Sequence, residues 1–114
     1  MHYLVRIVVE ADDAETAKKE TTRVAEELVE SGYHDWFNDN PKLSRWDNCW
    51  KPVALHTDEG LHEINEAFKE QLTDQYAGYH LFDLDGNPIM EPLEFADWVK
   101  DPFGYWITRL DCHE

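Results

Sequence analysis

Residues 3–32 of the chain, YLVRIVVEADDAETAKKETTRVAEELVESG, predict a β-strand followed directly by an amphipathic α-helix. The first part, Tyr3–Glu10, is rich in Val and Ile and is interrupted by Arg6, which is typical of a strand with one buried face. Asp12 is placed to cap the helix, with Glu15 as its capping-box partner, and Gly32 supplies the left-handed conformation that ends it. Between these ends, apolar residues recur at helical spacing: Ala14, Ala17, Val24, Ala25, Leu28 and Val29.

The rest of the chain repeats the alternation of strand and helix patterns. Four further strands are predicted, near Tyr33–Phe37 and at Trp50–His56, Tyr79–Leu84 and Tyr105–Cys112. A second helix is expected from Thr57 or Asp58 to Gly78, and a short one from Pro92 to about Val99. Between these helices, the turn chemistry of Asp85–Pro88 predicts a hairpin that returns through Ile89 and Met90.

This order of elements predicts a single α+β domain over residues 1–114. We expect a two-layer sandwich of ferredoxin-like βαββαβ order, with an added hairpin and a short C-terminal helix. In that arrangement both long helices cover one face of a mostly antiparallel sheet.

Charge is the strongest compositional signal. Asp and Glu total 25 against 10 Lys and Arg, which gives a formal net charge of −15 on 114 residues. Nucleic-acid backbones and anionic membranes attract clustered Lys and Arg, so we expect neither as a partner. No apolar stretch approaches the ~20 residues of a membrane-spanning helix, and no signal peptide is visible, so we expect a cytoplasmic protein. Abundant acids with scarce Ser and Ile resemble halophilic proteins, although Lys exceeds Arg.

The negative charge is absent from one segment, residues 31–57, where three Asp balance three Lys and Arg. This segment holds three of the five Trp, and aromatic residues with a few cations on loops are typical of interaction sites. Arg45 is expected to contact a Trp ring through a cation–π interaction. The alternative is that these Trp close a small core. The candidate binding residues are Trp36, Arg45, Trp46, Trp50, His56 and His80.

The spacings of Cys and His favour neither a disulfide scaffold nor a metal centre. Cys49 and Cys112 form no CxxC pair, which favours a reducing compartment, with a Cys49–Cys112 bridge as the alternative. No His pair has zinc-site spacing, so we expect no metal or cofactor; a site built from His56, His80 and Cys112 is the alternative. No catalytic centre is evident, because neither Ser lies in a GxSxG motif and the five Gly are scattered.

The segment FDLDGNPI, residues 82–89, also invites a metal interpretation. An EF-hand is excluded, because its sixth position, which must be Gly, is Pro88. The segment resembles the terminal hairpin of glyoxalase-type βαβββ modules, and that resemblance would place His2 at a metal-ligand position. Glu91 follows Asn87 by four residues, where the ligand of that family follows by three, so we do not assign the chain to it.

Three functions are compatible with the sequence. The first is a cytoplasmic binding or assembly module with a protein partner, which could be a second copy in a homodimer. The second is a small enzyme of the dimeric α+β barrel or metal-dependent type, with His34, His56 or His80 lining a pocket beside Trp36 and Trp50. The third is an acidic decoy that occupies the nucleic-acid site of another protein. We favour the module, because a halophilic surface explains the acidity without a decoy.

Overall fold

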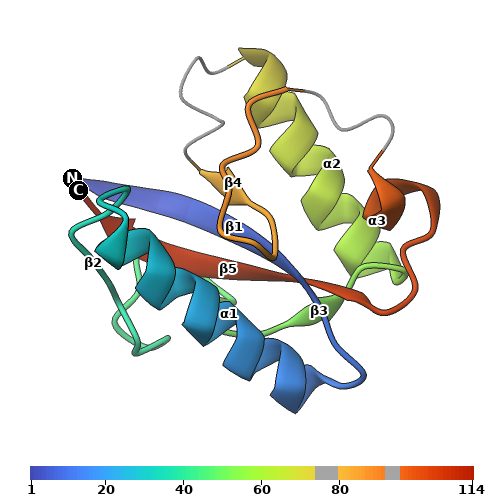
Figure 1. Cartoon of the computed structure of the whole chain (residues 1–114), viewed down its shortest axis with the longest axis horizontal. Coiled ribbons are helices and arrows are strands. Elements are labelled where there is room, and N and C mark those ends of the chain that lie inside the picture. Colours follow the sequence, from blue (N-terminus) through green and yellow to red (C-terminus); the bar gives the residue numbers. More distant parts are fainter. Residues whose placement is uncertain (74–79, 92–95) are drawn as a thin grey trace.

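The computed structural model describes residues 1–73, 80–91 and 96–114 as an α+β fold built on a mixed sheet of five strands (Figure 1). Its centre is the antiparallel pair of β1 (His2–Glu10) and β5 (Tyr105–His113), which is in register from His2↔His113 to Glu10↔Tyr105. β4 (Leu81–Phe82) pairs parallel with β1. β2 (Trp36–Phe37) and β3 (Val53–Ala54) pair antiparallel with the other edge of β5.

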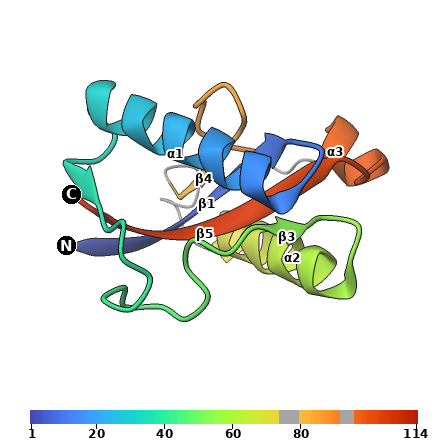
Figure 2. The same cartoon turned by 90° about the horizontal axis from the view of Figure 1, so that it is seen from below.

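The two long helices lie on opposite faces of this sheet. Figure 2 shows α1 (Ala14–Glu30) above the sheet and α2 (Asp58–Thr73) below it. The short α3 (Asp97–Lys100) precedes β5. The α+β class is thus confirmed, but the predicted two-layer sandwich is wrong. The ferredoxin-like order is not found in the described residues, and the sheet is not purely antiparallel because β4 runs parallel to β1.

The reason for this difference lies in β1, whose apolar residues face both ways. Val5, Ile7 and Val9 pack in one core cluster with Val24 and Leu28 of α1. Val8 packs in a second cluster on the other face: Leu55, Ile64, Ala67, Leu81, Ile89, Trp98 and Ile107. A nearly continuous apolar run is typical of a strand covered on both faces, and Arg6 does not break that coverage because it is buried.

Both long helices begin at side-chain caps. Asp13, and not the predicted Asp12, caps α1, because its carboxylate accepts the Thr16 N–H at 2.8 Å. These hydrogen bonds hold the pKa of Asp13 below its ordinary value. The predicted end at Gly32 is confirmed: its φ is +82°, its N–H donates to the Val29 carbonyl, and the Tyr33 N–H donates to the Leu28 carbonyl. Thr57, one of the two predicted caps, accepts the Gly60 N–H at the start of α2.

The strands predicted around the Trp-rich segment are shorter than expected. The segment predicted at Trp50–His56 contributes only β3, because Asn48 and Trp50 both adopt positive φ and interrupt the pairing along β5. The predicted hairpin turn is confirmed, since the Ile89 N–H donates to the Leu81 carbonyl after the turn. The expected end of α2 at Gly78, the start of the strand at Tyr79 and the start of the short helix at Pro92 lie outside the described residues. No helix in the described part of the chain is long and apolar enough to span a membrane.

Candidate functional site

Three aromatic side chains stand in one row across β2, β5 and β1, where these strands meet near both termini. Trp36 pairs in register with His113, and His113 pairs with His2. The indole of Trp36 stacks on the His113 ring, with centroids 5.1 Å apart and planes 9° from parallel. His2 stands edge-on to both rings, 5.6 Å from Trp36 and 5.3 Å from His113. We call this row the Trp36 stack; Trp36 is 43% exposed.

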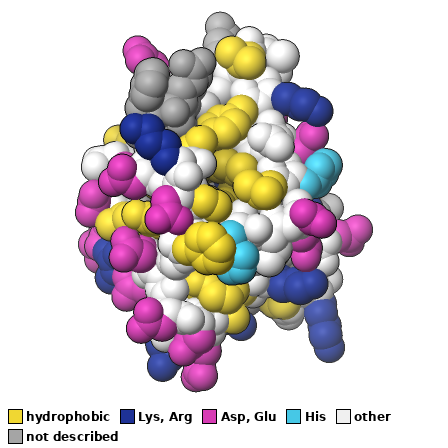
Figure 3. All heavy atoms as spheres, turned by 90° about the vertical axis from the view of Figure 1, so that its right-hand side faces the viewer, with side chains coloured by type: hydrophobic (Ala, Val, Ile, Leu, Met, Phe, Trp, Pro, Cys, Tyr) yellow, Lys and Arg dark blue, Asp and Glu magenta, His cyan; other side chains and the backbone are white. Residues whose placement is uncertain are grey.

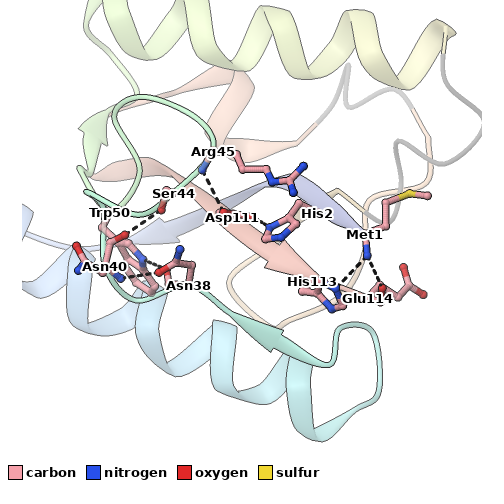
Figure 4. Close-up of polar contacts among 10 residues, drawn as sticks. All are labelled: Met1, His2, Asn38, Asn40, Ser44, Arg45, Trp50, Asp111, His113 and Glu114. Carbon is pink, nitrogen blue, oxygen red and sulfur yellow. Dashed lines mark hydrogen bonds and ion pairs between the residues drawn. The ribbon is translucent and has the colours of Figure 1, made fainter.

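A buried carboxylate contacts the His2 ring of the Trp36 stack; Figure 4 shows Asp111 between His2 and the backbone of Arg45. Asp111 is fully buried, and its Oδ1 lies 2.7 Å from His2 Nδ1. Its Oδ2 accepts the backbone N–H of Arg45 at 3.1 Å. A buried carboxylate requires such partners, and the contact at Nδ1 holds the His2 ring against Asp111. The site therefore ties the end of the sheet to the Trp-rich segment.

Of the predicted binding residues, Trp36 belongs to this stack and Arg45 reaches Asp111, but the predicted cation–π contact of Arg45 with a Trp ring is not found in the described residues. Arg45 is exposed, and its backbone reaches Asp111. Trp46 is half-buried against the core on the α1 face, and Trp50 is buried there with its Nε1–H donating to the Asn38 carbonyl at 2.5 Å. Trp46 and Trp50 therefore close the core on this face, which was the alternative to a binding role.

The two predicted His residues lie elsewhere. His56 stacks on Phe103, with centroids 4.7 Å apart, at the far end of the sheet. Phe103 is 70% exposed, and Figure 3 shows hydrophobic side chains gathering on the side of the molecule that carries α3. His80 contacts Tyr3, which faces the opposite side of β1 from His2. His34, the third His considered for a pocket, is buried, with its ring 5.8 Å from that of Phe82.

Sequence reasoning missed Asp111 and His113, and it considered His2 only as a metal ligand. The available signal was their spacing: Asp111 lies on the predicted strand Tyr105–Cys112 and His113 follows it by two residues, so a strand longer by one residue places both on one face. What the sequence could not provide was the register that places His2 opposite His113.

A second polar cluster lies under α2 and is structural. Arg6, 4% exposed, donates to Glu63 and Glu70, and Arg109 lies 3.3 Å from Glu63. Burial lowers the pKa of Arg6, but the hydrogen bonds and charges of Glu63 and Glu70 raise it overall, so this guanidinium stays charged. The cluster neutralises a cation placed within an apolar face.

Neither Cys is suited to nucleophilic chemistry. Both are free and buried, and burial raises the pKa of Cys112 to about 12. No group of three or more His, Cys, Asp or Glu within the described ranges is arranged to hold a metal ion.

On the α1 side of β2, the side opposite the Trp36 stack, a hollow of about 350 Å³ opens beside the C-terminal half of α1. It is lined by Glu26, Val29 and Glu30 from α1 and by Asp35, Trp36 and Phe37. Trp36 thus takes part in both features. No protein-family model, curated protein or solved structure matches the chain.

Proposed function

We propose that this protein is a binding module that docks a protein partner on the Trp36 stack. The observation that carries this proposal is that a large, exposed indole is held in place before any partner arrives. Single exposed apolar residues are common on protein surfaces and need no partner. Trp36 differs from them because His113 supports its flat face, and His113 in turn neighbours His2, which Asp111 orients.

Such support favours binding in two physical ways. Trp is among the residues that contribute most to interface energetics, because it removes a large area from water. A side chain that is already ordered also loses less conformational entropy when a partner covers it. The charge-poor segment that carries Trp36 removes the electrostatic repulsion that the rest of the acidic surface would impose on an acidic partner.

We also propose that the acidity adapts the protein to a salt-rich cytoplasm. A net charge of −15 repels other copies at low ionic strength, and salt screens this repulsion within about 10 Å at 0.1 M. Self-association into a homodimer is therefore expected only at high salt. Light scattering across a salt series tests this salt-dependent dimerisation, and a constant mass of 13.5 kDa at every salt concentration would contradict it.

A peptide-display selection tests the binding function. We expect a random-peptide library panned on the immobilised protein to enrich sequences that bind wild type and lose binding to Trp36→Ala. The matched control is Phe103→Ala, which removes a more exposed aromatic side chain at the far end of the sheet. Enrichment that survives Trp36→Ala, or that Phe103→Ala abolishes instead, would contradict the proposal. A library that yields no binder would do so too.

A further inference from the structure

An apolar band runs along one side of α2. Leu61, Phe68 and Leu72 follow each other at intervals of seven and four residues, so they share one side of the helix. Leu61 is 42% and Leu72 is 74% exposed, while Phe68 and Val99 of α3 pack half-buried against the same core cluster. Figure 3 shows hydrophobic side chains gathered in a strip on this face of the molecule. We call Leu61, Phe68, Leu72 and Val99 the α2 band.

The α2 band extends the apolar side of the helix beyond the part that the sheet covers. The residues that α2 buries are Gly60, Ile64 and Ala67. Leu61 and Leu72 lie beside them on the helix but stay exposed. A contiguous apolar patch of this kind marks an interaction surface, in contrast to scattered single leucines. From Leu61 to Leu72 the band is about 16 Å long, which matches the apolar stripe on three turns of another helix.

The charges that border the α2 band are mainly negative. Four carboxylates stand in the first turn of α2 and at the two ends of α3: Asp58, Glu59, Asp97 and Asp101. Lys69, beside the band, is paired with Glu66, and Lys100 is a second cation on α3. Burial raises the pKa of Tyr105, which packs against the same cluster, and the charges of Glu10 and the two α3 carboxylates raise it further. The potential at this end of the sheet is therefore negative.

We propose that the α2 band docks an amphipathic helix of a protein partner, and that Lys and Arg flank the apolar stripe of this helix. The band shares no residue with the Trp36 stack, so the inference goes beyond the binding function proposed there. A helix presents apolar residues at the matching three- and four-residue spacings, and its basic flanks meet the carboxylates that border the band. A second copy of the chain is a poorer occupant, because both copies carry a net charge of −15.

The probe for this inference is a capped peptide of about 18 residues, long enough to form a helix, with Leu at helical spacing and Lys elsewhere. Titrated into the protein at fixed salt, it should shift amide signals centred on residues 61–72 and 97–100. Leu61→Gln with Leu72→Gln should weaken binding about tenfold or more, because two leucines lose apolar contact area. The control is Leu43→Gln, since Leu43 is 72% exposed and lies outside the band; it should change the affinity less than about twofold.

Several outcomes would overturn the inference. Equal affinity for a scrambled peptide of the same composition would show attraction to the net charge alone, and equal affinity for the Leu and Glu counterpart would show that basic flanks are not recognised. Equal weakening by Leu43→Gln and Leu72→Gln, or no binding at all, would remove the α2 band as the site. Self-association of the free protein that Leu61→Gln with Leu72→Gln abolishes would show that a second copy is the occupant.

The two proposed surfaces are tested separately. Short peptides seldom form helices in water, so a display selection of such peptides reports on the Trp36 stack, and the helical probe reports on the α2 band. Probe binding retained in Trp36→Ala supports the band even if the Trp36 stack binds nothing. Probe binding lost in Trp36→Ala but kept in Leu61→Gln with Leu72→Gln would overturn the inference.

Discussion

Replacing Asp111 with Asn should destabilise the protein by about 2 kcal/mol, because the wild-type carboxylate is fully buried and has two partners. Asn has nearly the same volume, so no cavity forms, and its amide oxygen can still accept the Arg45 N–H. The contact to His2 Nδ1, 2.7 Å in the wild type, loses its charged acceptor. Hydrogen bonds to charged groups contribute about 1.5–3 kcal/mol each, which sets the expected loss.

Urea denaturation at fixed salt, followed by far-UV circular dichroism, measures the free energy of unfolding of Asp111→Asn. Asp39→Asn is the matched control, since it makes the same charge change at an exposed position of the neighbouring loop and should stay within about 0.5 kcal/mol of wild type. A double-mutant cycle with His2→Ala should give a coupling of about 1 kcal/mol or more. The reasoning is refuted if Asp111→Asn matches wild type, or if the two substitutions are additive.

Two further predictions concern packing and titration. Gly60→Ala should destabilise the protein by about 2 kcal/mol despite the higher helix propensity of Ala, because its Cβ would lie 2.2 Å from the Ala54 carbonyl oxygen; urea denaturation measures this, and a stabilised variant would contradict it. Cys112 should react with iodoacetamide at pH 8 at least a hundredfold more slowly in the native protein than in urea, because its folded pKa is about 12. The unfolded thiol ionises near 9.0, so this group should lower stability as pH rises from 9.0 towards 12; native-state labelling as fast as in urea would refute the burial.

The residues that sequence patterns predicted best are those whose role is local. The strand at Tyr3–Glu10, the end of α1 at Gly32 and the final strand follow from side-chain alternation and turn chemistry, and all three are present. The coverage of both sheet faces could also have been predicted, because the apolar run of β1 is almost unbroken. Within it, Val8 points to one face of the sheet and Ile7 and Val9 point to the other.

The candidate site was harder to predict because it depends on register. Trp36, Trp46 and Trp50 were named together as binding candidates, but Trp36 is exposed while Trp46 and Trp50 lie against the core, and no composition argument separates these cases. His113 and Asp111 become significant only once β1 and β5 pair along their whole length and place His2 opposite His113. The pairing of two strands from opposite ends of the sequence is set by tertiary structure, and the periodicity of a single sequence does not contain it.

The order of the Trp36 indole in solution tests most directly whether this protein presents a preorganised binding surface. Nitrogen-15 relaxation of the Trp36 Nε1–H reports its motion on the picosecond-to-nanosecond timescale. We predict an order parameter of about 0.85, equal to that of rigid backbone, in the protein without any partner. A value below about 0.6 would show a mobile indole and would contradict the proposal that His113, His2 and Asp111 hold it ready for binding.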